Sequence, residues 1–88
     1  PSSAATILEV GCYTDVNTST IAFYEATETS PNASSSTIVN SLICDNNMAT
    51  TTTFLDSAVA DRNLITAMLL AISNSTNTIA YVKYSIQP

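Results

Sequence analysis

Few side chains in this chain could carry chemistry, because its 88 residues include no histidine and only two cations, Arg62 and Lys83. Histidine is the residue most often used in general acid–base catalysis. Cys12 and Cys44 lack the further cysteine or histidine ligands of a zinc site. Gly11 is the only glycine, which excludes a glycine-rich phosphate-binding loop. We therefore expect no enzyme, no catalytic residue, no metal site and no cofactor.

The seven carboxylates offer one arrangement that catalysis could use. Glu9 and Glu25 would face each other if residues 6–26 formed a hairpin, and paired carboxylates can act as general acid and base. The alternative, which we favour, is that like charges on an exposed sheet face serve solubility alone. The segment DNNM, residues 45–48, offers oxygen ligands but lacks the ligand number and the glycine of a calcium-binding loop.

Cys12 and Cys44 are an even pair in a small chain rich in Ser, Thr and Asn, which is typical of a secreted domain with one disulfide. Closing that loop would stabilise the fold by about 3–4 kcal/mol in the chain-entropy model. The alternative is a pair of buried free thiols in a cytosolic protein. We expect the disulfide, and with it an extracellular location.

Two further features agree with secretion. The chain starts at Pro1 without methionine, as a mature protein does after removal of a signal peptide. Three N-x-S/T sequons are candidate N-glycosylation sites on a secreted surface. They begin at Asn17, Asn32 and Asn74.

The charge balance narrows the choice of partners. A net charge of −5 excludes nucleic acid, because phosphate backbones are bound by clustered Lys and Arg. The same shortage of cations argues against binding to anionic membrane surfaces. The longest apolar run, residues 67–72, is far shorter than the ~20 residues that span a bilayer. Since 45% of the residues are hydrophobic, residues 1–88 should fold as a single small domain.

Hydroxyl, amide and aromatic side chains remain as the means of recognition. A sugar presents polar edges and apolar C–H patches, which suit Asn and Asp side chains beside an aromatic ring. Such residues gather in two predicted turns, and a Cys12–Cys44 disulfide would bring those turns together. The alternative is that they are ordinary turn residues. The candidate ligand-binding residues are Tyr13, Asp15, Asn17, Asn46 and Asn47.

Alternation of apolar and polar residues predicts strands over most of the chain. Polar segments separate them, the longest being TETSPNASSS at residues 27–36. We expect a mainly β (α+β) fold, a small antiparallel five-stranded OB-like barrel or sheet whose first two strands form a hairpin. The strands are predicted at about residues 6–14, 20–26, 37–44, 50–56 and 78–86.

One helix is predicted at about residues 62–73, in the C-terminal half. Asp61 can cap its N-terminus. Five apolar residues would share one face at helical spacing, namely Leu64, Ile65, Met68, Leu69 and Ile72.

Another face of this helix would carry a flat, uncharged stripe. It consists of Thr66, Leu70 and Ser73. We interpret it as a subunit contact, against the alternative of an ordinary exposed surface.

The stretch NLITAMLLAISNSTNTIAYVKYS, residues 63–85, resembles the helix-then-strand ending of the OB-fold B subunits of bacterial AB-type toxins and of small secreted bacterial proteins similar to them. The resemblance extends over about residues 54–85. It implies a five-stranded barrel, a ring of subunits with helices facing a central channel, and glycan binding at the outer loops. The turn NSTN departs from the glycine and basic residue usual in that family. No ligand-binding motif matches position by position, so no site residue is transferred.

The expected function is that of a secreted, non-enzymatic, oligomeric binding module, with a carbohydrate as its ligand. The alternative is a structural subunit of an extracellular filament or surface assembly, in which the segment ATILEV, residues 5–10, completes a neighbour's sheet. A lone inhibitor-like domain is a third interpretation. The first two differ in symmetry, because ring interfaces close and head-to-tail interfaces can remain open.

Overall fold

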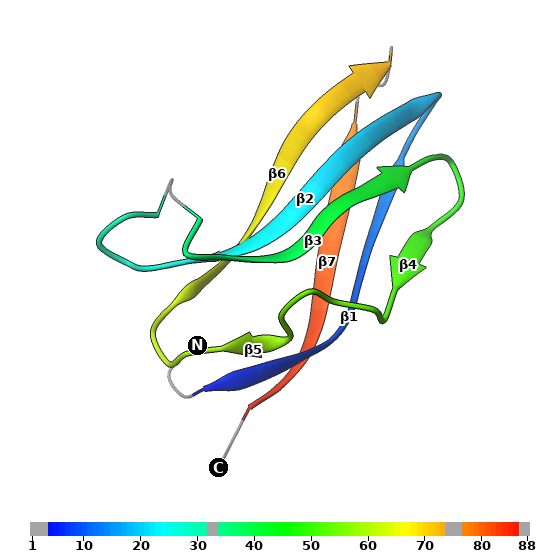
Figure 1. Cartoon of the computed structure of the whole chain (residues 1–88). Helices are drawn as coiled ribbons and strands as arrows, with labels where there is room; N and C mark the ends of the chain where they lie inside the picture. The colour runs from blue at the N-terminus through cyan, green and yellow to red at the C-terminus, as the bar shows by residue number, and fades with distance from the viewer. Residues whose placement is uncertain (1–3, 32–33, 74–76, 87–88) are drawn as a thin grey trace.

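The chain forms β-strands in two antiparallel sheets, without a helix in the part that the structure describes (Figure 1). The structure is a computed structural model and describes residues 4–31, 34–73 and 77–86. The strands are β1 (Ala5–Thr14), β2 (Thr18–Ala26), β3 (Ser36–Cys44), β4 (Ala49–Thr51), β5 (Ala58–Val59), β6 (Leu64–Ser73) and β7 (Thr78–Ile86).

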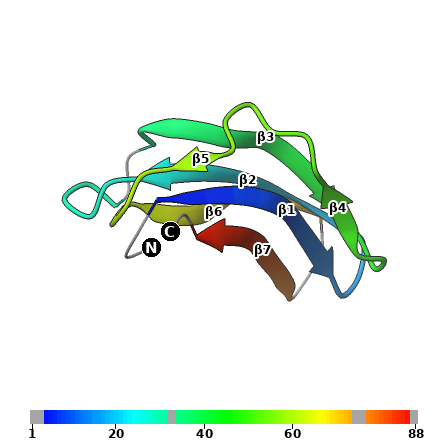
Figure 2. The same ribbon diagram turned by 90° about the horizontal axis from the view of Figure 1, so that it is seen from below.

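Sheet A is built around β1. Strand β7 pairs with β1 along its whole length, from Ala5 opposite Ile86 to Thr14 opposite Thr78. The short strands β4 and β5 share the other edge of β1. Sheet B has the order β3-β2-β6. Figure 2 shows β6 and β7 toward one side of the molecule and β3 and β5 toward the other.

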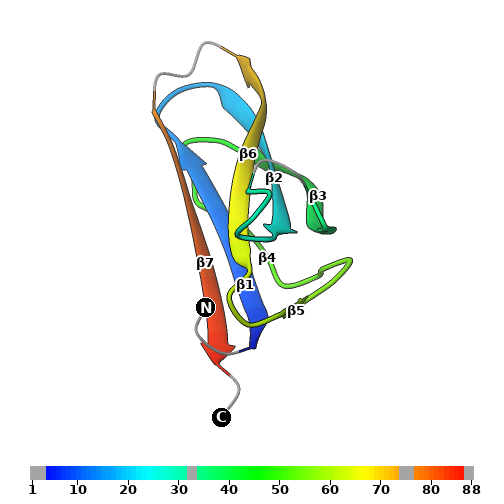
Figure 3. The same cartoon turned by 90° about the vertical axis from the view of Figure 1, so that its left-hand side faces the viewer.

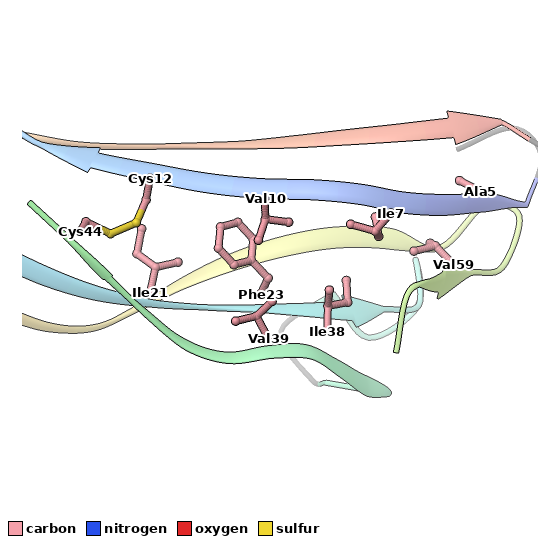
Figure 4. Close-up of a cluster of buried hydrophobic side chains, with 10 residues drawn as sticks. All are labelled: Ala5, Ile7, Val10, Cys12, Ile21, Phe23, Ile38, Val39, Cys44 and Val59. Carbon is pink, nitrogen blue, oxygen red and sulfur yellow. A yellow bond between two sulfur atoms is a disulfide. The ribbon is translucent and has the colours of Figure 1, made fainter. Parts of the chain in front are cut away.

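The two sheets pack face to face as an open sandwich. Figure 4 shows side chains of both sheets pointing toward each other, with the fully buried Phe23 of β2 among them. A disulfide between Cys12 and Cys44, with a Cα–Cα distance of 5.4 Å, joins β1 of sheet A to β3 of sheet B. The predicted disulfide is therefore confirmed. The core residues are Ala5, Ile7, Val10, Cys12, Ile21, Phe23, Ile38, Val39, Cys44 and Val59.

The predicted helix at residues 62–73 is wrong, because Leu64–Ser73 form strand β6. This strand pairs with β2 from Leu64 opposite Ala26 to Ser73 opposite Thr18. A continuous apolar run contains both the helical and the strand period, and the free edge of β2 provides backbone partners that favour the strand. The helix on which the resemblance to toxin B subunits depends is absent from this segment.

Asp61 belongs to a turn rather than to a helix cap. The backbone amide of Asn63 donates to the carbonyl of Ala60 over 3.2 Å, which closes the turn. Arg62 has a φ of 67°, and a positive φ at the third residue is characteristic of a type II turn. Strand β6 begins directly after this turn, at Leu64.

The closed barrel and the N-terminal hairpin are also wrong. The two sheets do not close into a barrel. Strands β1 and β2 belong to different sheets, so the turn after Thr14 carries the chain from sheet A to sheet B. The segment ATILEV lies in the central strand β1, where its edges are already paired, and it is not free to complete a neighbour's sheet.

The strand predicted at residues 50–56 is much shorter than expected, since β4 ends at Thr51. After β4, backbone amides donate hydrogen bonds to nearby side chains instead of to a neighbouring strand. Thr53 N donates to Thr51 Oγ1 over 3.1 Å, and Ala58 N donates to Asp56 Oδ1 over 3.0 Å. Such side-chain bonds compete with strand pairing.

Candidate functional site

Three segments converge at the end of the sandwich near the disulfide. Thr14 N donates to Asp45 O over 2.8 Å, which joins the β1–β2 turn to the β3–β4 turn. Asp15 N donates to Asn77 O over 3.1 Å, which adds the start of β7. The buried hydroxyls of Thr14 and Ser19 each lie 3.1 Å from the hydroxyl of Thr78. We call this region, residues 14–18, 45–48 and 77–78, the turn end.

The predicted ligand-binding residues are distributed unevenly over this region. Asn17, Asn46 and Asn47 are exposed at the turn end. Asp15 is used within the fold: its Oδ1 accepts bonds from Val16 N at 2.9 Å and Asn77 N at 3.1 Å. Tyr13 lies on the outer face of sheet A, because its neighbours in β1, Cys12 and Thr14, point inward and are fully buried.

Of the three sequons, only the one at Asn17 falls within the described residues. Asn17 is exposed and has a φ of 59°, in the left-handed region that asparagine tolerates. The sequons at Asn32 and Asn74 lie outside the described residues.

Glu9 and Glu25 do not form the pair that a hairpin would have made, because they belong to different sheets. Glu9 accepts a hydrogen bond from the hydroxyl of Tyr81, which sits across from Gly11 on β7. This bond, followed by partial burial and the Glu9 charge, raises the pKa of Tyr81 above the usual 10.0. The ring of Tyr81 covers Gly11 so closely that a Cβ there would lie 2.7 Å from Tyr81 Cζ.

Glu25 is buried and holds three segments together. Its Oε2 accepts bonds from Asn63 Nδ2 at 2.6 Å and from Ala60 N at 3.0 Å, so it fixes the turn before β6. Its Oε1 accepts from the hydroxyl of Ser36, which also lies 2.9 Å from Asp56 Oδ2. These contacts give Glu25 a structural role at the end of the sandwich opposite the disulfide.

Strands β6 and β7 lie on one side of the sandwich, each at the edge of its sheet (Figure 3). They carry apolar side chains that are not fully covered. Leu69 is paired with the buried Ile21 and faces the same way, yet it is 47% exposed. On β7, Tyr84 and Ile86 are paired with the buried Ile7 and Ala5, yet they are 49% and 48% exposed. We call the outer edges of β6 and β7, with Leu69, Tyr84 and Ile86, the open side.

The open side also differs from the rest of the chain in charge. None of the seven acidic residues lies in Leu64–Ser73 or Thr78–Ile86, and Lys83 is the one charged residue in these two segments. The rest of the chain carries all the acidic residues of a protein with net charge −5. Two copies of the chain would therefore repel each other least at the open side.

The predicted subunit-contact residues lie on β6. Thr66 pairs with Tyr24 and is half-buried, and Leu70 is an exposed extra residue between two registered pairs. Ser73 pairs with Thr18, and the contacts of its side chain lie outside the description. Sequence reasoning did not identify Leu69, Tyr84 and Ile86 as candidate contact residues. The signal that could have revealed them is ten residues from Leu64 without a charge, followed by a second strand with only Lys83.

No pocket is found in residues 4–31, 34–73 and 77–86. The same residues contain no group of three or more Cys, Asp or Glu side chains close enough to hold a metal ion. Nowhere in the described chain is there a helix of the length and hydrophobicity needed to cross a membrane. Comparison with protein-family models, with curated proteins and with solved structures finds no match.

Proposed function

We propose that this protein is a non-enzymatic structural subunit of an extracellular assembly and associates with copies of itself through the open side. The observation that carries the proposal is the row of half-exposed apolar side chains on two edge strands with a single charge. Unpaired strand edges accept strands from other chains, and exposed apolar patches are typical of interaction sites.

The disulfide supports the extracellular part of the proposal. Cys12 and Cys44 are both fully buried in the core, where their bond ties the two sheets together. Structural disulfides of this kind persist in oxidising compartments and are rare in the cytosol. In an extracellular assembly, contacts with neighbouring copies can stabilise a chain that has few charges and many Ser, Thr and Asn residues.

The experiment is native mass spectrometry over a range of protein concentrations, with negative-stain imaging of the same samples. The proposal expects masses above that of the monomer, either a discrete oligomer or open polymers. A protein that stays monomeric at every concentration would contradict it.

A second candidate function, carbohydrate binding, is supported by the convergence of exposed amides at the turn end. Asn17 comes from one turn and Asn46 and Asn47 from another, and the Thr14–Asp45 hydrogen bond joins the two. Glycan-array binding that disappears when these three asparagines are changed together to alanine would support this candidate. Binding that survives the triple change, or no binding to any glycan, would count against it.

A further inference from the structure

The two edges of sheet B differ in their freedom to pair. On β3, the carbonyl of Ile38 accepts a hydrogen bond from Leu55 N at 2.9 Å, so the β4–β5 connection covers part of that edge. Within the described residues, β6 pairs with β2 alone. Its outer edge has no charge and no proline, two of the devices by which proteins block edge-to-edge pairing. The free edge of sheet B for another strand is therefore that of β6.

A β-bulge limits the regular part of this edge. Ile21 pairs with Leu69 and Thr20 pairs with Ala71, so Leu70 is an extra residue in β6. A bulge bends the strand and increases its twist, which disturbs regular pairing beyond it. The regular edge is the segment before the bulge, from Leu64 to Leu69, and its middle lies at Thr66 and Ala67.

We infer that a second copy of this chain pairs its β6 with the β6 of the first, antiparallel, about a two-fold axis through Thr66 or Ala67. This inference rests on the proposed function, because it names the surface and symmetry of the association. Identical edges that pair antiparallel are related by a two-fold axis. Two three-stranded sheets then join into one continuous sheet.

The position of the axis follows from the faces of the strands. Residues directly opposite in an antiparallel pair point to the same face, and neighbours along a strand point to opposite faces. The inward faces of both copies lie on the same side of the joined sheet only if one residue of β6 lies directly opposite the same residue of the other copy. The two-fold axis then lies at the level of that residue and not between two consecutive residues. An axis through Thr66 or Ala67 meets that condition at the middle of the regular edge.

Charge and apolar surface favour a second copy as the occupant. In this arrangement the two charge-free β6 strands meet, and no acidic residue of either copy lies on the paired strands themselves. The half-exposed Leu69 of each copy gains apolar neighbours at the joined edge. Head-to-tail pairing of β6 with β3 of another copy is disfavoured, because it would have to displace Leu55 from Ile38.

Single-cysteine variants test the axis directly. Both native cysteines are buried in a disulfide, so an introduced cysteine is the free thiol available for cross-linking. Residues opposite each other across an antiparallel pair have Cβ atoms about 4.5–5.5 Å apart, close to the distance that a disulfide spans. The variants are Thr66→Cys and Ala67→Cys, with Ile43→Cys as the control, since Ile43 is an exposed apolar residue on β3.

Under mild oxidation we expect one of the two β6 variants to form disulfide-linked dimer at least roughly ten-fold faster than Ile43→Cys, because association raises the effective thiol concentration. Cross-linking of both β6 variants at the slow rate of the control, in a protein that native mass spectrometry shows to be oligomeric, would overturn the two-fold β6 pairing and leave the proposed function standing. A monomeric wild-type protein would overturn both.

Discussion

Ile21 and Leu69 lie directly opposite each other in the β2–β6 pair and face the same side of sheet B, but Ile21 is 4% exposed and Leu69 is 47% exposed. Over Ile21 the core of the sandwich is complete, with the disulfide beside it (Figure 4). The sandwich is finished on the side of β3, β4 and β5 and open on the side of β6 and β7. The function proposed for this protein depends on that asymmetry.

The buried carboxylate of Glu25 should contribute strongly to stability. The variant Glu25→Ala removes the acceptor of Ala60 N and Asn63 Nδ2 and leaves these donors poorly satisfied. We expect the free energy of unfolding to fall by about 2–4 kcal/mol, measured by urea denaturation. The control is Glu28→Ala, which removes an exposed 2.9 Å ion pair with Arg62 and should cost less than about 1 kcal/mol. Equal losses in the two variants would contradict the structural role of Glu25.

Gly11 should be required by the ring of Tyr81. In Gly11→Ala the new Cβ would lie 2.8 Å from the hydroxyl oxygen of Tyr81, so the ring must move and its bond to Glu9 is lost. We expect a loss of about 1–2 kcal/mol in the free energy of unfolding. A double-mutant cycle checks the cause, because the same change in a Tyr81→Ala background should have little effect. A loss of the same size in both backgrounds would show that Tyr81 is not the reason for the glycine.

Tyr81 should make stability depend on alkaline pH. Its pKa in the folded protein is raised, so the stabilisation from the protonated phenol is fully present below the usual value of 10.0 and is lost as the pH rises through the raised value. Urea midpoints of the wild type and of Tyr81→Phe are compared from about pH 8 to pH 11. We expect the advantage of the wild type to shrink at the alkaline end. An advantage that stays constant or grows would contradict the bond from Tyr81 to Glu9.

Loss of the disulfide should be costly, because it joins the two sheets. Changing Cys12 and Cys44 together to alanine removes a loop closure between residues 32 positions apart and should lower the free energy of unfolding by about 3–4 kcal/mol. Chemical reduction of the wild type is the matched comparison and should give a loss of similar size. A variant as stable as the wild type would show that packing of the core suffices to hold the sheets together.

The sequence was sufficient to predict the strands that alternate clearly between apolar and polar residues. The alternation in residues 6–14 and 78–86 corresponds to β1 and β7, and the cysteine pair corresponds to the observed disulfide. The prediction for residues 64–73 failed, because their apolar residues fit a helical face and a strand equally well. Only the edge of β2 decides between the two. A short turn after Thr14 predicted a hairpin, but it joins two sheets.

For the candidate sites, too, local patterns predicted some features and missed those that depend on the tertiary structure. Turn composition identified Asn17, Asn46 and Asn47 as exposed polar residues, but it could not show that Asp15 is engaged with Asn77. The open side depends on which inward-facing residues the opposite sheet fails to cover. That property of Leu69, Tyr84 and Ile86 follows from the pairing of strands distant in sequence, and no local pattern contains it.

The central claim, that the protein associates through its open side, is tested most directly by sedimentation of the wild type and two lysine variants over a range of concentrations. In Leu69→Lys a charge points inward at the edge strand, which blocks pairing, and we expect the dissociation constant to rise at least roughly ten-fold. Leu55→Lys adds the same charge at a leucine that is 67% exposed outside β6 and β7, and it should associate like the wild type. Equal association of all three proteins, or a wild type that sediments only as a monomer, would contradict the claim.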